Sequence, residues 1–155
     1  MWPLVIVISM ASAIGCLLLA GQGSREPAQQ QVVGEDLALN MAVYRTLVVE
    51  YARAHPTFTG SVGHGVLPEP SWYRRSSTWK NQVRGDGTIV IYGAPAATAG
   101  LTTQIAELSS YSINAGEARV PSSGGTATLW TPRFGDTGLQ LPGVPAGATV
   151  WIGRL

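Results

Sequence analysis

The sequence predicts an α+β protein in which an N-terminal transmembrane helix precedes a long amphipathic helix packed on an antiparallel β-sheet, with a second short helix. Three observations support this prediction. Residues 2–21 contain no charged side chain, apolar residues then recur at helical spacing, and a two-residue periodicity takes over beyond Pro56. We expect a transmembrane anchor at 1–22, a linker at 23–34 and one α+β domain at 35–155.

Composition narrows the classes of function. The 155 residues carry 10 basic and 9 acidic side chains, for a net charge of +1. This balance lacks the basic face that nucleic-acid binding needs, so we expect no nucleic-acid partner. Cys16 is the single cysteine, which leaves no partner for an internal disulfide and no CxxC metal site.

The N-terminal segment, residues 2–21, is long enough to cross a bilayer. Twenty helical residues rise about 30 Å, the thickness of the hydrocarbon core, and Trp2 lies where an interfacial aromatic anchor would lie. Two alternatives stay open: a signal peptide cleaved after Ala20, which would lack the usual basic n-region, and a lipoprotein signal ending at Cys16. We favour an uncleaved membrane anchor.

A polar linker follows at residues 23–34, and its Gln run could equally extend a flanking helix. Glu35 and Asp36 are expected in the first turn of the amphipathic helix, where they complement the helix dipole. Arg53 and His55 are expected in its last turn, and Pro56 ends it.

The apolar stripe of this helix recurs in steps of four, three, four and three residues. We interpret the stripe as a core face packed on a sheet, with a partner-docking coiled-coil helix as the alternative. Its members are Leu37, Met41, Tyr44, Val48 and Tyr51, widened by Val43 and Leu47.

Strands are expected beyond the helix. Residues 79–83 and 88–92 read as a β-hairpin in which Asp86 and Gly87 supply turn residues with positive φ. The β-branched run at 88–92 is expected to be a buried central strand. The RGD tripeptide at 84–86 is explained by the same turn chemistry.

A second helix is expected at 96–110, with Leu101, Ile105 and Leu108 facing inward. Two strands follow at 110–120 and 126–132, around the sequence PSSGG. The last strand, 148–155, alternates its side chains. Val150 and Ile152 are expected on one face, with Trp151 and Gly153 on the other.

Residues with catalytic or metal-binding chemistry show no functional spacing. His55, His64, Glu50, Glu69 and Asp86 form no metal-binding motif, and no nucleophile elbow or phosphate loop is present. We therefore expect no catalytic, cofactor-binding or metal-binding residues, no cofactor and no small-molecule substrate.

The tripeptide Asp-Thr-Gly at 136–138 matches the tripeptide around the carboxylate of aspartic proteases. That chemistry needs two aspartates, so Asp136 would act only in a symmetric dimer. We expect this stretch to be a turn.

Residues 72–80, WYRRSSTWK, interleave aromatic and basic side chains, a composition that could bind nucleic acid or lipid headgroups. At a net charge of +1 we favour packing of the aromatics under the sheet, with the cations pointing to water. The aromatics are Trp72, Tyr73 and Trp79, and the cations are Arg74, Arg75 and Lys80.

Five stretches resemble the PilM family of conjugative-plasmid thin pilus systems, which belong to the type IV pilus class. They are NMAVYRTLVVEYARAHP, TGSV, LPEPSWY, TWKNQVRGDGTIVIY and TLWTP. The resemblance implies an apolar inner-membrane anchor, a periplasmic domain, other pilus assembly proteins as partners, and no catalytic residues. It outweighs Arg25, which alone would favour a cytoplasmic domain.

The overall plan is also similar to that of type IV pilins. The chain departs from prepilins because it lacks a basic leader, the Glu at the fifth mature position and a C-terminal cysteine pair. We therefore expect a membrane-anchored accessory component of a conjugative type IV pilus assembly system. The alternatives are a minor pilin-like subunit and a membrane-anchored dimeric aspartic hydrolase using Asp136.

Overall fold

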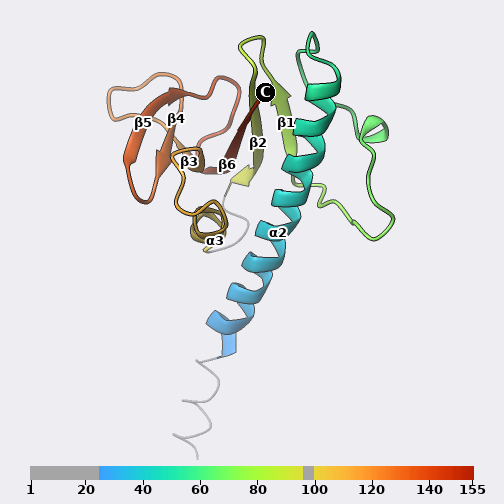
Figure 1. The fold of residues 1–155 in the computed structure, drawn as a ribbon. Helices are drawn as coiled ribbons and strands as arrows, with labels where there is room; N and C mark the ends of the chain where they lie inside the picture. The colour runs from blue at the N-terminus through green and yellow to red at the C-terminus, as the bar shows by residue number, and fades with distance from the viewer. Residues whose placement is uncertain (1–24, 96–99) are drawn as a thin grey trace, which may run out of the picture.

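The computed structural model describes residues 25–95 and 100–155, and over these residues it confirms the α+β class (Figure 1). The predicted anchor at 1–22 lies outside the described residues, and no helix within them is long and apolar enough to cross a membrane. The elements in order are α2 (Arg25–Ala54), a 3₁₀ turn (His64–Val66), β1 (Lys80–Val83), β2 (Thr88–Pro95), α3 (Leu101–Leu108), β3 (Ala115–Arg119), β4 (Thr128–Thr131), β5 (Gly135–Gln140) and β6 (Ala148–Arg154).

The six strands form one antiparallel sheet in the order β1-β2-β6-β3-β4-β5. The predicted hairpin is β1–β2, and the predicted strands around PSSGG are β3–β4. The connection from β2 to β3 runs through α3 and leaves a slot that the C-terminal strand β6 fills. The sheet is therefore complete only when the last residues of the chain are in place.

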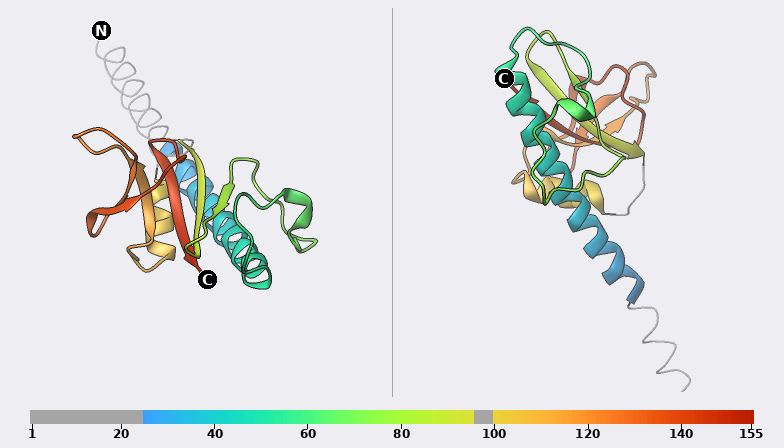
Figure 2. Two further views of the ribbon diagram at one scale, coloured as in Figure 1. Left: turned by 90° about the horizontal axis from the view of Figure 1, so that it is seen from above. Right: turned by 90° about the vertical axis from the view of Figure 1, so that its right-hand side faces the viewer.

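Both faces of the sheet are buried, but by different means. Helices α2 and α3 cover one face, where Ile89, Ile91 and Trp151 join their core (Figure 2). On the other face Val150 and Ile152 lie in a second cluster with residues of β4 and of the loop after β5. The predicted alternation along β6 is therefore confirmed.

Helix α2 is described from Arg25, which is already ten residues before the predicted start. Residues 25–34 of the expected linker are thus helical, as the alternative extension of the Gln run allowed. Glu35 and Asp36 consequently lie inside the helix and not in its first turn. Arg53 does lie in the last turn, as predicted. The N-terminal part of α2 projects beyond the sheet (Figure 1).

From Ala38 onward the predicted stripe of α2 is core. Met41, Tyr44 and Val48 are fully buried, and Leu47 is nearly so. Each such side chain stabilises the fold by about 1.5–3 kcal/mol. Leu37, Val43 and Tyr51 at the margins are only partly buried.

A glycine lets α2 approach the sheet closely. A Cβ atom on Gly153 of β6 would lie 2.7 Å from Val49 Cγ2, a distance that packed atoms do not tolerate. The Arg45 guanidinium sits beside the same strand, where its Nε donates to the Ile152 carbonyl at 3.2 Å. The contact between helix and strand therefore depends on the missing side chain.

The β1–β2 turn uses its glycine as predicted and its aspartate differently. Gly87 adopts a φ of 78°, whereas Asp86 keeps a negative φ. The Asp86 carboxylate instead accepts the Thr88 N–H at 2.9 Å, and hydrogen bonds to Thr88 lower the pKa of this carboxyl. The turn is thus fixed by one left-handed glycine and one side-chain acceptor.

Two further predictions are wrong. Leu108, which was expected to face inward, is 43% exposed. The reason is that α3 ends there and Ser110 takes a left-handed φ of 55°. Residues 96–99 of the predicted helix lie outside the described residues. Asp136 and its neighbours lie in the edge strand β5 and not in a turn. Positive φ angles at Gly135 and Gly138 reconcile this turn-like sequence with pairing to β4.

Candidate interaction surfaces

Of the residues with catalytic or metal-binding chemistry, Glu50 and His55 line one depression at the end of α2. His55 follows α2 and stacks on Tyr51, with ring centroids 4.2 Å apart, and its Nδ1 lies 2.9 Å from the Tyr51 carbonyl. His55 therefore closes the helix end. Glu69 forms an ion pair with Arg75. Within the described residues no group of three His, Cys, Asp or Glu side chains could hold a metal ion.

Asp136 is exposed on β5. Its Oδ1 accepts the N–H of Gly138 at 2.9 Å, so the carboxylate stabilises its own strand locally. Its Cα partner on β4 is Trp130. The position offers an open surface in place of the enclosed apolar site that holds an aspartic dyad.

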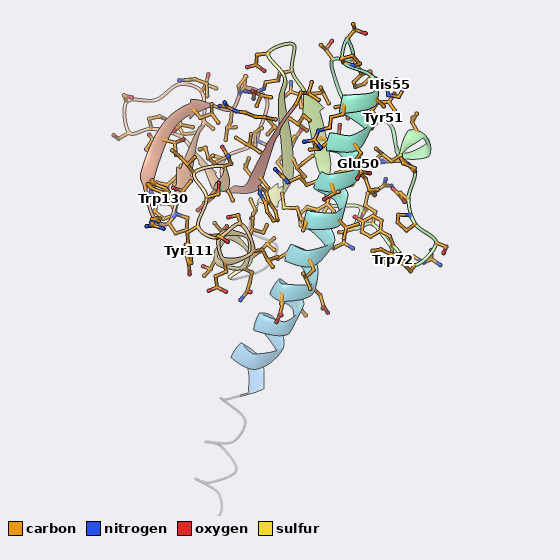
Figure 3. All side chains as sticks on the ribbon, viewed as in Figure 1. Glu50, Tyr51, His55, Trp72, Tyr111 and Trp130 are labelled. Atoms are coloured by element: carbon orange, nitrogen blue, oxygen red, sulfur yellow. The ribbon has the colours of Figure 1, made fainter. Side chains whose placement is uncertain are left out.

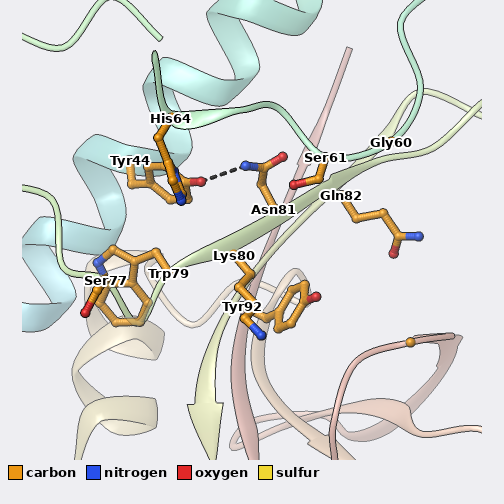
Figure 4. A pocket seen from close by; sticks show the side chains of 11 residues that line it. Tyr44, Gly60, Ser61, His64, Ser77, Trp79, Lys80, Asn81, Gln82 and Tyr92 are labelled. Carbon is orange, nitrogen blue, oxygen red and sulfur yellow. Dashed lines mark hydrogen bonds between the residues drawn. The ribbon is translucent and has the colours of Figure 1, made fainter. Parts of the chain in front are cut away.

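A cavity of about 460 Å³ opens at the edge of β1, between that strand and the segment around the 3₁₀ turn (Figure 4). Asn81 lies at its base and links three groups: its Nδ2 donates to the Tyr44 hydroxyl at 2.6 Å and to the Val62 carbonyl at 3.0 Å, and its Oδ1 accepts the Val62 N–H at 2.7 Å. Burial raises the pKa of Tyr44, so the phenol stays neutral. This buried network fixes the loop to β1 and α2.

A second asparagine, Asn40, fixes a later part of the same loop, which connects α2 with β1. Asn40 Oδ1 accepts the Trp79 indole N–H at 2.8 Å and the Ser76 N–H at 3.1 Å, and Asn40 Nδ2 donates to the Arg74 carbonyl at 2.8 Å. The Tyr73 hydroxyl donates to the Asn40 carbonyl at 3.0 Å, and burial raises the pKa of that phenol. Residues 73–79 are therefore held against α2 by the side chain and the carbonyl of one residue, Asn40.

The aromatic and basic side chains at 72–80 differ in burial, and the sequence pattern does not predict which of them are buried. Tyr73 and Trp79 are buried, as predicted, but Trp72 is 70% exposed, so that prediction is wrong. Arg74 and Lys80 are exposed, as predicted. Arg75 departs from the prediction: its side chain is only 17% exposed, because it pairs with Glu69 at 2.7 Å and lies over the Tyr44 ring.

Exposed apolar side chains gather at two places. The first, here called the Trp72 groove, lies between the outer face of α2 and the loop, with a volume of about 300 Å³; Leu39, Val43, Trp72 and Arg74 line it. The second, here called the Tyr111 patch, lies after α3 and consists of Leu108, Tyr111 and Ile113, which are 43%, 41% and 51% exposed. Figure 3 shows Trp72 and Tyr111 on opposite sides of α2.

The Tyr111 patch rests on a fixed backbone. The Tyr111 N–H donates to the Ala106 carbonyl at 2.6 Å and the Ser110 N–H to the Glu107 carbonyl at 2.8 Å, a pattern that ends helices when the residue after the cap is left-handed. Glycine usually fills that position, yet here Ser110 and Tyr111 have φ angles of 55° and 54°. Such backbone costs about 1–3 kcal/mol per residue and concentrates at functional positions.

Neither Asn40 nor Asn81 is predicted from the sequence as a residue that organises the loop between α2 and β1. Asn81 had a detectable signal, because asparagine is unfavourable within a strand and stands in the middle of the predicted β1. Asn40 had none, because its partners are 33–39 residues away along the chain.

The fold defines a class: small α+β domains in which a long N-terminal helix packs on an antiparallel sheet that the C-terminal strand completes. The PilM family matches residues 7–152. The chain belongs to the PilM family, which confirms the resemblance and connects the chain with pilus biogenesis.

A solved structure from Escherichia coli shows the same fold. A PilM protein from Escherichia coli B7A superposes with a TM-score of 0.56 at 18% identity, over 81% of this chain and 94% of that one. A PilM protein from Pseudomonas aeruginosa 2192 gives a TM-score of 0.45 at 27% identity, over 78% and 97%. A comparison with curated proteins finds no match.

Proposed function

We propose that this protein is a membrane-anchored accessory component of a conjugative type IV pilus assembly system. Residues 2–21 would cross the inner membrane once, and the domain would lie in the periplasm. The proposal assigns no catalytic residue and no cofactor to the chain. Its partners are other pilus assembly proteins.

The observation that carries the proposal is the helical stretch that precedes the packed part of α2. The chain is already helical at Arg25, four residues after the uncharged segment ends, and Ala38 is the first fully buried apolar side chain among those described from residue 33 onward. Ala38 lies thirteen positions after Arg25 along the helix, a rise of roughly 20 Å. Helix α2 would therefore hold the sheet away from the bilayer surface, where it can meet a neighbouring protein.

The Tyr111 patch is the surface that we assign to another pilus assembly protein. Three exposed apolar side chains on a strained, hydrogen-bonded turn present a preformed anchor, and preformed anchors lose little entropy on binding. The patch lies at the end of α3, beside the sheet and apart from the Trp72 groove (Figure 3).

Topology and mating tests examine the proposal together. The full chain should resist extraction by high salt and carbonate, and alkaline phosphatase fused after Leu155 should be active.

Deletion should abolish pilus-dependent mating, and Tyr111→Ser should reduce mating while protein levels stay constant. Val120, which is 50% exposed, supplies the matched control Val120→Ser. An inactive phosphatase fusion, or a mature form starting near Gly21, would contradict the anchored periplasmic arrangement.

A minor pilin-like subunit is the second candidate, and the long α2 packed on an antiparallel sheet favours it. The two functions differ in where the protein resides. A subunit would be found by mass spectrometry in sheared, purified pili, whereas an accessory component would stay with the membrane fraction. Acid protease activity that Asp136→Asn abolishes would support the hydrolase instead.

A further inference from the structure

The Trp72 groove combines a protruding side chain with a hollow. Trp72 is 70% exposed, and Leu39 on the adjoining face of α2 is 48% exposed. The hollow beside them measures about 300 Å³ and has Leu39 and Val43 in its lining. Large aromatic side chains of this kind dominate binding energy when they insert into a pocket of a partner.

The groove is already organised for binding. Asn40 holds the Arg74 carbonyl at 2.8 Å, and Tyr73, next to Trp72, is anchored to Asn40 by its hydroxyl. The backbone that follows Trp72 is thus fixed against α2, and the Tyr73 N–H closes a turn around Trp72 by donating to the Pro70 carbonyl at 2.9 Å. Little conformational entropy is then lost when a partner covers it.

The charges of the groove are of both signs. Asp36 and Arg74 both line it, and both are exposed. In the part of the chain that the structure describes, the salt bridges are Arg75–Glu69 and Arg119–Glu117, so neither Asp36 nor Arg74 has an ion-pair partner among those residues.

We propose that the Trp72 groove binds the Trp72 groove of a second copy of this chain, forming a two-fold dimer. A two-fold interface must be self-complementary, because the same patch supplies both sides. Here a protruding Trp72 stands beside a hollow that can receive its equivalent, and Asp36 shares the surface with an oppositely charged Arg74. Trp72 of each copy inserts over Leu39 and Val43 of the other, and Asp36 of each copy faces Arg74 of the other.

The contact extends along α2. A second depression, of about 330 Å³, lies between the end of α2 and the 3₁₀ turn, and it includes Tyr51 and Val66, the latter 56% exposed. The face from Asp36 to Ala54 spans roughly 27 Å of helix. A parallel pairing of the two α2 helices brings both N-terminal segments to the same end, and this orientation rests on the proposed single membrane anchor.

Sedimentation of the full chain in detergent tests the dimer. Wild type should sediment as a dimer, and Trp72→Ala should be a monomer with an unchanged circular dichroism spectrum. Phe134→Ala removes an aromatic ring that is 53% exposed on the β4–β5 side and should remain a dimer. A dimer that persists in Trp72→Ala would overturn the proposal, since it would then be held by other residues.

Charge reversal provides an independent test. Asp36→Arg and Arg74→Asp should each weaken self-association roughly tenfold or more, because like charges then face each other. The double variant should restore it. A double variant as weak as either single variant would refute the assigned pairing, as would a monomeric wild type whose Trp72 binds a different pilus protein. Membrane anchoring and phosphatase activity should be unchanged in all of these variants, so failure of the dimer is distinguishable from failure of the proposed function.

Discussion

The two parts of α2 differ although they belong to one continuous helix. From Ala38 to Ala52 the helix has a fully buried face against the sheet and α3. Before Ala38 the described side chains are mostly exposed, and Val33 is 51% accessible. Among the residues whose exposure is described, tertiary packing therefore holds the part of α2 from Ala38 onward.

The difference shows how one helix can serve both as core and as connection. Helices in proteins owe most of their stability to a packed amphipathic face, and the described side chains of α2 form such a face from Ala38 onward, against the sheet, α3 and the loop before β1. The earlier part continues the same helix toward the uncharged segment. We infer that the later part stabilises the domain and that the earlier part sets its distance from the membrane.

The largest expected effect comes from Val48→Asp. Val48 is fully buried, and an unpaired carboxylate in an apolar core costs several kcal/mol, against a total stability of about 5–15 kcal/mol. Purified residues 25–155 carrying this change should be unfolded, or melt far below wild type, in circular dichroism. A wild-type melt would show that this face of α2 is not core.

Asn40→Ala should have the next largest effect. It removes the acceptor of the Trp79 indole N–H and of the Ser76 N–H, and each buried donor left unpaired costs about 1–3 kcal/mol. Urea unfolding should show this loss, and limited proteolysis should cut within 73–79. An uncut loop with full stability would mean that the loop is held by its aromatic packing alone.

Gly153→Ala tests the close packing between the later part of α2 and strand β6. The added methyl group would lie 2.7 Å from Val49 Cγ2, and overpacking of this kind costs about 1–3 kcal/mol. Val49→Ala should relieve the clash, so the double variant should lose less stability than the two single losses added together. Strictly additive losses in urea unfolding would place helix and strand farther apart than described.

Val33→Asp, the matched partner of Val48→Asp, should have the smallest effect. The same substitution on the exposed part of the helix should change stability by less than about 0.5 kcal/mol. The melting curve of residues 25–155 measures it. A loss comparable with that of Val48→Asp would show that the early part of α2 also has a buried face.

Helical periodicity and turn residues correctly predicted those elements that depend on residues close together in the sequence. The four buried positions Met41, Tyr44, Leu47 and Val48 follow helical periodicity, and the β1–β2 hairpin follows from the turn at Asp86-Gly87. The start of α2 was misplaced because the Gln run has neither a breaker nor a clear cap, so sequence alone left two outcomes open.

The candidate surfaces were harder to predict because they depend on distant partners. Tyr73 and Trp79 are buried since each finds Asn40, from which they lie 33 and 39 residues away. Trp72 has no such partner in the described residues and is exposed. Leu108 fits the apolar spacing of α3, but the left-handed turn at Ser110 leaves it on the surface. Composition and periodicity contain no information about these pairings.

Hydrogen–deuterium exchange along α2 in the full chain tests the two-part account most directly. Amides of residues 41–52 should exchange only through global unfolding, because their side chains are packed, whereas amides of residues 25–37 should exchange orders of magnitude faster through local opening. Uniformly slow exchange along the whole helix would contradict the account, because the early part would then be held by contacts as strong as the core.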